Sequence, residues 1–460
     1  MSTTTPPTTG DDEQRQAGRR RSMFVAAFGS VIEWYDFSIY FYVATILTRE
    51  FFGNETDSLI LTLGVGAAGF LFRPLGAVVF GHIGDRTGRK AALVISAVLM
   101  AIAMLGTAAL PGYTAVGIWG GVGMVLLRCL AGFSVGAEYT GIMVFLMESA
   151  GPRRRGFAAS WAAANSEIGA LLAVGIAAVL AGNLSADAMQ AWGWRVLFVV
   201  GGLLALVMIP LRRMMVETET VERTHHATPA AGATAAVRSP LVAVLRGQPR
   251  AVLIAFGIST IGSVSYFLNI TYVPTYLEDV AHLANAGSLA LGTIAAVVAI
   301  VVTPFIGLAS DRWGRRVSLG LLTVVIVLTT IPAYLLMSSG NSGLAVFGAA
   351  FLAIPAAGWS AVAAATVPEQ FTAVGRFSGM AVGYNVATVL FGGLSPLIAT
   401  GLIAGTGISL SPAIYATVVV VVAGIPVLLL MRDMAGRSLA EVDRDREIDT
   451  VAEPVGSSAD

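Results

Sequence analysis

The sequence predicts an all-α integral membrane protein in which twelve transmembrane helices form two six-helix bundles. One observation is composition: 56% of the 460 residues are hydrophobic and 12% are charged, whereas soluble domains carry roughly 25% charged residues. A second is that apolar segments of the roughly 20 residues needed to cross a bilayer recur along the chain. A third is a polar motif that occurs twice, about half the chain apart.

The apolar segments are separated by short polar breaks, and each is predicted to be one membrane-spanning helix. They are residues 23–48, 58–82, 90–110, 117–148, 157–181, 194–213, 251–277, 286–308, 317–338, 343–369, 377–402 and 409–431. A longer polar segment with an Ala/Thr/Pro tract separates the first six from the last six, and its composition is typical of a linker.

The domain organisation follows from these spans. We predict a cytoplasmic N-terminal tail (1–22), an N-terminal six-helix bundle (23–213), a cytoplasmic linker (214–250), a C-terminal six-helix bundle (251–431) and a cytoplasmic tail (432–460). The arginines support this orientation, because loops rich in Lys and Arg stay in the cytoplasm. Arginines recur in the predicted inner segments throughout the twelve spans. The predicted outer loops hold almost none, and Arg49 and Arg195 are the exceptions.

Two halves of the chain repeat each other. "GHIGDRTGRK" (81–90) follows the second span and "GLASDRWGRR" (307–316) follows the eighth, with their aspartates 226 residues apart. Glu148 and Arg155 follow the fourth span, and Glu369 and Arg376 follow the tenth with the same spacing. Parallel repeats of six spans are typical of transporters whose substrate site lies between the repeats near the bilayer midplane.

The first span contains two acids in "GSVIEWYDFSIY" (29–40). Glu33 and Asp36 are three residues apart and therefore share one helix face. Burial and a neighbouring acid both favour the protonated form of a carboxyl group, so this pair is equipped to accept and release a proton. The alternative is a structural ion pair with Arg73 or Arg128. Coupling is the preferred interpretation for Asp36, and the structural one for Glu33.

Other ionisable residues within the spans are also functional candidates, because charges are costly in a bilayer. Arg128 is predicted either to bind a substrate carboxylate or to neutralise one of the first-span acids. Glu138 is predicted either to take part in proton coupling or to form an ion pair with Arg73. Glu167 is predicted either to line the cavity or to make local hydrogen bonds.

The paired G-x-x-x-D-R-x-G-R-[KR] motifs resemble the signature of the major facilitator superfamily. Further stretches resemble its metabolite:H⁺ symporter family over about residues 23–435: "EWYDFSIY", "RPLGAVVFGHIGDRTGRK", "GFSVGAEYTG", "AWGWRVLF", "TYVPTYL" and "GYNVATVLFGGLSPLIA". "GFSVGAEYTG" and "RRRGFAASW" are most similar to bacterial proline/glycine-betaine:H⁺ symporters. The chain departs from them in Ala137, where G-G-E is usual, and in a C-terminal tail without sustained coiled-coil heptads.

The resemblance implies proton-coupled symport of a small polar metabolite, such as a proline- or betaine-type osmolyte, into the cytoplasm by alternating access. It implies a monomeric, multi-pass protein of the bacterial inner membrane whose partners are its solute, H⁺ and the lipid bilayer. Alternatives are a proton symporter of an organic acid (citrate, 2-oxoglutarate or shikimate), a proton/drug antiporter, and a non-transporting sensor on the same fold.

Residue roles follow from the resemblance and from the residue types. The family pattern implies a gating set of ion pairs, in which Glu148 binds Arg89 or Arg155 and Glu369 binds Arg315 or Arg376. The predicted gating residues are Asp85, Arg86, Arg89, Glu148, Arg155, Asp311, Arg312, Arg315, Glu369 and Arg376. The predicted substrate-binding residues are Arg128, Tyr139, Tyr266, Asn269, Trp359 and Tyr384. The aromatic residues are included because aromatic faces hold quaternary ammonium groups well. The alternative for the aromatic residues is packing.

Several function classes are excluded. The chain has no G-x-S-x-G, P-loop or H-E-x-x-H motif, so neither an enzyme nor ATP-driven transport is indicated. We expect no cofactor and no metal site. The net charge is zero, so bulk charge gives no indication of a nucleic-acid partner.

Overall fold

In the computed structural model, the described part of the chain is residues 9–52, 58–87, 89–136, 138–214, 240–280, 285–372 and 376–439, with 441 and 444. All regular structure within these ranges is helical. The first half consists of α1 (Thr9–Tyr42), α2 (Ala44–Phe51), α3 (Ser58–Thr87), α4 (Arg89–Ala109), α5 (Tyr113–Val116), α6 (Ile118–Val135), α7 (Glu138–Ser149), α8 (Arg155–Asn183), α9 (Ala186–Ala188), η1 (Met189–Gly193) and α10 (Trp194–Arg213).

The second half begins with a short helix, α12 (Pro240–Gly247), inside the segment expected to be a linker. Its Val244 is buried in the core. The remaining elements are α13 (Pro249–Tyr266), η2 (Phe267–Thr271), α14 (Val273–Asp279), α15 (Asn285–Trp313), α16 (Arg315–Met337), α17 (Ser342–Glu369), α18 (Arg376–Thr388), η3 (Val389–Gly393), α19 (Ser395–Thr406) and α20 (Ser411–Leu430).

Each predicted span coincides with one helix or with consecutive helical elements. Within the described ranges, ten helices are long and apolar enough to cross a membrane, and Gly64–Phe80 is a shorter apolar stretch inside α3. The first predicted span corresponds to the end of α1 together with α2. Large apolar side chains such as Leu126, Phe305, Leu328 and Val422 are exposed on the outside, as expected of a surface that faces lipid.

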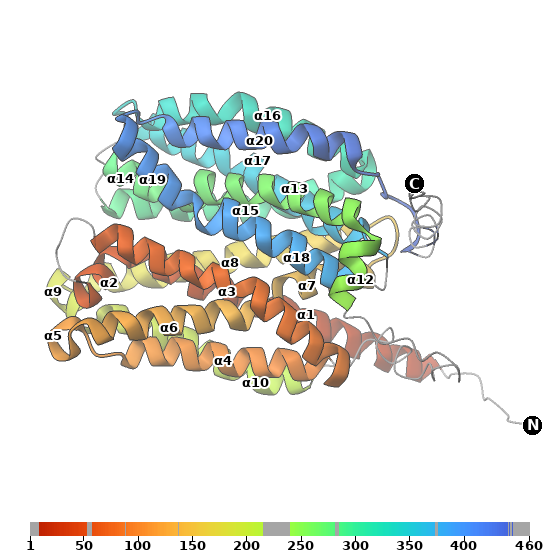
Figure 1. Cartoon of the computed structure of the whole chain (residues 1–460), viewed down its shortest axis with the longest axis horizontal. Helices are drawn as coiled ribbons and strands as arrows, with labels where there is room; N and C mark the ends of the chain where they lie inside the picture. Colours follow the sequence, from red (N-terminus) through yellow and green to blue (C-terminus); the bar gives the residue numbers. More distant parts are fainter. Residues whose placement is uncertain are drawn as a thin grey trace, which may run out of the picture.

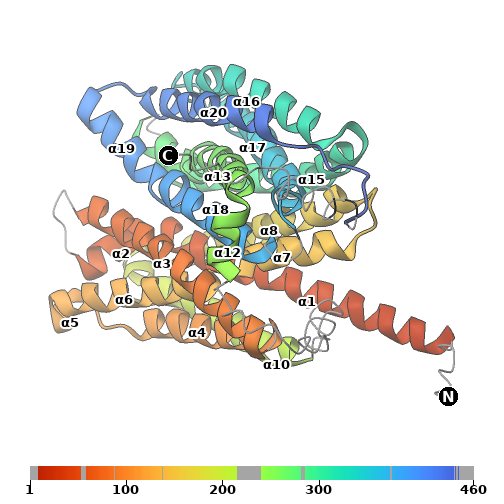
Figure 2. The same cartoon turned by 45° about the vertical axis from the view of Figure 1, so that its right-hand side comes forward.

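The helices lie in two groups. Figure 1 shows α1 to α6 and α10 on one side and α13 to α20 on the other, and the turned view keeps this division (Figure 2). The groups meet where α8 packs against α15 and α17, and where α18 packs against α3 and α7. The functional residues below lie along this junction.

Close helix crossings depend on glycine. Gly132 and Gly136 form a G-x-x-x-G pattern of the kind that lets membrane helices approach backbone to backbone. A Cβ atom on Gly132 would collide with the carbonyl of Gly69 in α3, and one on Gly136 would lie 2.6 Å from the amide nitrogen of Ala77. This crossing brings Arg73 of α3 and Arg128 of α6 into the interior beside α1.

Two long helices of the second half are interrupted by π-helical turns, η2 and η3. The turns face each other, because a Cβ atom on Gly392 would lie 2.9 Å from the Phe267 ring. Single π turns inside α-helices occur frequently at functional sites. Apolar periodicity gives no signal for η3, where the sequence predicted a plain helix, whereas η2 lies in the span ending "YVPTYL", whose sequence suggests a broken helix.

Candidate functional site

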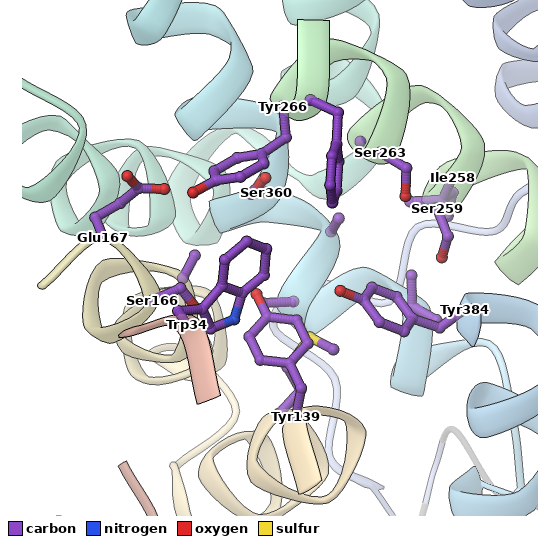
Figure 3. A pocket seen from close by; sticks show the side chains of 17 residues that line it. Trp34, Tyr139, Ser166, Glu167, Ile258, Ser259, Ser263, Tyr266, Ser360 and Tyr384 are labelled. Atoms are coloured by element: carbon purple, nitrogen blue, oxygen red, sulfur yellow. The ribbon is translucent and has the colours of Figure 1, made fainter. Parts of the chain in front are cut away.

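A pocket lies between the two groups of helices. Its aromatic walls are Trp34 of α1, Tyr139 of α7, Tyr266 of α13 and Tyr384 of α18 (Figure 3), together with Phe267 of η2. Its polar lining consists of Glu167 and the hydroxyls of Ser166, Ser259, Ser263 and Ser360. The empty space is about 570 Å³ when its opening to solvent is included, so the enclosed part suits a small solute.

The aromatic walls join the two halves. The Trp34 and Tyr266 rings meet edge to face with centroids 5.0 Å apart, and the Tyr139 and Tyr384 rings are 5.4 Å apart. Trp34 also contacts Tyr139, at 6.1 Å. The pocket therefore exists only while both halves are in contact.

Glu167 is the acid of the pocket. It is 3% exposed, and its Oε2 atom has no hydrogen-bond partner. The Tyr266 hydroxyl, from the other half, points toward this carboxyl group (Figure 3). Among the described residues, no arginine or lysine lines the pocket.

An aromatic cluster lies beside the pocket. Phe37 and Phe70 of the first half contact Phe267 of the second, with centroids 5.4 and 5.6 Å apart. In α1, Phe37 follows the pocket residue Trp34, and in the second half Phe267 follows Tyr266. Since α1 and α13 begin at the same end of the molecule (Figure 1), the cluster separates the pocket from the opposite end.

The acids of α1 each bind an arginine. Glu33 is paired with Arg73 of α3. Asp36 accepts two hydrogen bonds from Arg128, of 2.6 and 3.1 Å. Of the two roles predicted for Arg128, the structure therefore has the neutralising one, and Arg128 does not line the pocket. The Arg128 guanidinium also lies 5.1 Å from the centre of the Tyr40 ring.

Glu138 has a different partner from the one predicted. It is paired with Arg212, near the end of α10, and it accepts a hydrogen bond of 2.9 Å from Ser96. The expectation of a pair with Arg73 is therefore wrong, because Arg73 is already paired with Glu33. Arg212 is itself buried.

A second set of ion pairs closes one end of the junction. We call this the ion-paired end and define it by Glu148, Arg155, Asp311, Glu369 and Arg376. The Glu148–Arg376 pair, at 2.9 Å, and the Arg155–Glu369 pair, at 3.4 Å, both join the two halves. Asp311 also crosses the junction, accepting hydrogen bonds of 2.7 and 2.8 Å from the backbone amides that begin α8.

This arrangement corrects part of the predicted pairing. Glu369 does bind Arg315, at 3.2 Å, as predicted, and Arg315 also binds Asp311 at 2.8 Å. Glu148, however, binds Arg376 rather than Arg155, and Arg155 binds Glu369. The repeats exchange arginines: Glu148 of the first half binds Arg376 of the second, and Glu369 of the second half binds Arg155 of the first.

The segment after α20 also contacts this end. Arg155 donates hydrogen bonds to the carbonyl oxygens of Met434 and Arg437, at 2.9 and 2.5 Å. The Asp433 carboxylate accepts from the amides of Arg315 and Arg316 at the start of α16, both at 3.1 Å. A carboxylate at a helix N-terminus is stabilising, so this segment is held to both halves.

Several predicted site residues lie elsewhere. Trp359 is fully buried and donates a hydrogen bond to the Ile258 carbonyl at 2.9 Å behind the pocket. It does not line the pocket, and its role in binding solute stays a prediction. Asn269 is buried in η2 and also does not line the pocket. Arg312 is exposed. The side chains of Asp85, Arg86 and Arg89 are outside the described part.

Sequence reasoning missed part of the lining. Ser166, Ser259, Ser263 and Ser360 were not predicted, since lone serines are common in membrane helices. Trp34 had a signal, an aromatic residue inside an apolar span, but it was not assigned to the solute site. For Glu167, cavity lining was one of the two predicted roles, and it does line the pocket.

Comparison with known proteins identifies related transporters. Residues 22–445 match the family described as "Sugar (and other) transporter". The glycine betaine/proline/ectoine/pipecolic acid transporter OusA of Dickeya dadantii is 31% identical over 429 residues, which cover 91% of this chain and 84% of that protein. The proline/betaine transporter of Escherichia coli K12 is 31% identical, with coverage of 91% and 85%.

A relative with a different solute is also similar. The alpha-ketoglutarate permease of Escherichia coli K12 is 33% identical over 418 residues, which cover 90% of this chain and 94% of that protein. Among solved structures, the proton:xylose symporter XylE bound to 6-bromo-6-deoxy-D-glucose has a TM-score of 0.73 at 19% identity, covering 93% of this chain and 99% of that one. This last similarity concerns the fold alone.

Proposed function

The chain belongs to the sugar (and other) transporter family of the major facilitator superfamily, and from this premise we propose that it imports a small zwitterionic solute of the proline or betaine type together with a proton. Membership of this family makes it a membrane transporter and not an enzyme. Some relatives are named for proline and betaine, and another is named for alpha-ketoglutarate. The choice between these solutes therefore depends on the residues that line the pocket.

The residues that line the pocket favour one class of solute over the other. Five aromatic side chains line it, and aromatic faces attract quaternary ammonium groups. An organic diacid would need arginine or lysine to balance its charges, and no described residue of either type lines the pocket. The lining thus favours a solute with a positive nitrogen over the runner-up, an organic acid. The lining also includes an acid, Glu167, and serine hydroxyls, which the bulky, lipophilic solutes of a proton/drug antiporter would leave without a polar partner.

Alternating access is supported by contacts on both sides of the pocket. The aromatic cluster lies on one side and the ion-paired end on the other, and both join the two halves. We propose that the ion-paired end is cytoplasmic and opens when the pairs of Glu148 and Glu369 separate. Asp85, Arg86, Arg89 and Arg312 are proposed to complete this gate. The boundaries of the bundles, linker and tails remain those predicted from the sequence.

Proton coupling is proposed to act through Asp36. Protonation of Asp36 would remove the charge that holds Arg128, so the bidentate pair would separate and the helices α1 and α6 could shift against each other. Glu33 and Glu138, each paired with its own arginine, are proposed as supporting sites. We further propose a monomeric transport unit in a bacterial inner membrane, with both termini in the cytoplasm.

Proteoliposomes containing the purified chain test this function. Proton uptake is measured on addition of proline, glycine betaine, citrate, 2-oxoglutarate or shikimate, with protein-free liposomes as the control. Proton uptake with proline or betaine is expected. Uptake with the organic acids alone would favour the runner-up, and uptake with none of the five would contradict the proposal.

A further inference from the structure

We infer that Glu167 is the direct contact for the positive nitrogen of the solute and thereby selects the solute by charge. This inference rests on the proposed function, which it deepens by naming the residue and the property that it recognises. Sequence reasoning left two roles open for Glu167, cavity lining or a local hydrogen bond. Three features of the described residues argue for the first role.

The first feature is that Glu167 lacks a cationic partner. The other buried carboxylates of the described residues, those of Glu33, Asp36, Glu138 and Glu369, are each paired with an arginine. Glu167 has no such pair, and its Oε2 atom is buried without a hydrogen-bond partner. A buried charge is costly unless it is paired. A cation brought by the solute would supply the missing partner.

The second feature is the aromatic surface next to this carboxylate. Trp34 and Tyr266 lie beside Glu167 and face the same space (Figure 3), and their rings are 5.0 Å apart. Ring faces attract cations and also provide apolar contact for N-methyl or ring methylene groups. An ammonium or quaternary ammonium group at this place would contact both the carboxylate and the rings.

The third feature is the polar group on the far side. Figure 3 shows Glu167 on one side of the pocket and Ser259 on the other. The Ser259 hydroxyl is buried and has no hydrogen-bond partner, and Ser263 lies next to it in the lining. A hydroxyl donates to a carboxylate without adding a charge. The pocket is thus polarised, with an acid for the nitrogen of a zwitterion and hydroxyl donors for its carboxylate.

Carbon isosteres test charge selection without changing shape. Glycine betaine is compared with 3,3-dimethylbutanoate, in which carbon replaces the nitrogen, and choline is compared with 3,3-dimethylbutan-1-ol. Equilibrium binding of all four to the purified full chain in detergent is measured for the wild type, Glu167→Gln, Glu167→Asp and Ser360→Ala. Ser360→Ala is the control, since it changes an uncharged group in the same pocket.

In the wild type we expect each nitrogen compound to bind more tightly than its carbon isostere. In Glu167→Gln this preference should fall on the order of tenfold to a hundredfold, as for close charge pairs in other complexes, while binding of the isosteres changes little. Glu167→Asp should keep part of the preference, and it serves as the test if the glutamine variant does not fold. Ser360→Ala should affect both members of each pair equally.

Two results would overturn the inference: equal binding of nitrogen and carbon compounds by the wild type, or an equal loss for both in Glu167→Gln. The second result would indicate a structural role. Failure of the proposed function gives a different pattern. If choline shows a preference that depends on Glu167 while glycine betaine does not bind, the inference is supported and the zwitterionic solute is wrong. If none of these compounds binds, both are wrong.

Discussion

Reversing the charge of Glu148 should open the ion-paired end. In Glu148→Arg, the arginine would face Arg376, which now lies 2.9 Å from the glutamate. The pair joins the two halves and does not stabilise either half by itself, so its loss should change the balance of conformations more than the stability of the fold. Combining Glu148→Arg with Arg376→Glu restores opposite charges in exchanged positions.

The magnitude follows from burial of the pair. The side chain of Arg376 is 3% exposed and that of Glu148 is 20% exposed. Exposed pairs contribute about 0–1 kcal/mol, whereas breaking a fully buried pair costs about 3–5 kcal/mol. This pair lies between those cases. Its loss should therefore change the ratio of closed to open conformations by about 1–3 kcal/mol, or roughly 5- to 150-fold.

The assay is a distance distribution across the ion-paired end. Spin labels replace Arg154 and Arg316, which are exposed and belong to opposite halves, after Cys129, the single cysteine, has been changed to serine. Glu148→Arg should increase the long-distance population, and the double exchange should reduce it again. Glu50→Arg is the matched control, because the Glu50–Arg195 pair, at 3.1 Å, lies within one half.

One outcome would refute this reasoning. If the distance distributions of the single reversal, the double exchange and the wild type coincide, the Glu148–Arg376 pair does not hold the ion-paired end closed. A long-distance population that also appears in Glu50→Arg would point instead to a general effect of charge on this protein.

Three further predictions concern coupling, closure and topology. Asp36→Asn should retain exchange of labelled for unlabelled solute but lose accumulation driven by a proton gradient; full accumulation would exclude Asp36 as the coupling site. Gly307→Val should favour the open ion-paired end in the spin-label assay, because a Cβ atom there would lie 2.6 Å from Ser160 in the other half; an unchanged distribution would contradict this. Reporter fusions at Thr224 and Asp460 should both report the cytoplasm, and a periplasmic signal from either would contradict the twelve-span topology.

Helix positions were largely predictable because hydrophobicity alone determines them. The predicted span 343–369 and the observed α17, Ser342–Glu369, differ by one residue. The breaks inside helices were not predictable in this way. The span predicted at 377–402 contains η3, a π turn at Gly392 and Gly393, and a π turn leaves the apolar pattern unchanged.

The pocket was only partly predictable, because a residue type does not state which way a side chain points. Tyr139, Tyr266 and Tyr384 were predicted and do line it, but Trp359 fills space behind Gly262 instead. Which aromatic side chain faces the pocket depends on the rotation of each helix and on the docking of the two halves. Both are set by long-range packing that a single sequence does not display.

At the ion-paired end too, the partner of each side chain depends on how the two halves dock. The pairs observed there also indicate how this end could open. The repeat makes Arg155 and Arg376 equivalent in sequence, so only the contact between the halves decides which acid each one binds. When the halves separate, Glu369 loses Arg155 but keeps Arg315, at 3.2 Å within its own half. Glu148 loses Arg376 but is already 20% exposed, so water can replace the arginine. Neither acid is left buried and unpaired, so opening should cost less than the roughly 3–5 kcal/mol of breaking a fully buried pair. If apolar side chains replaced these ion pairs, Arg315 and water could no longer act as replacement partners when the halves separate. We would then expect this end to stay closed.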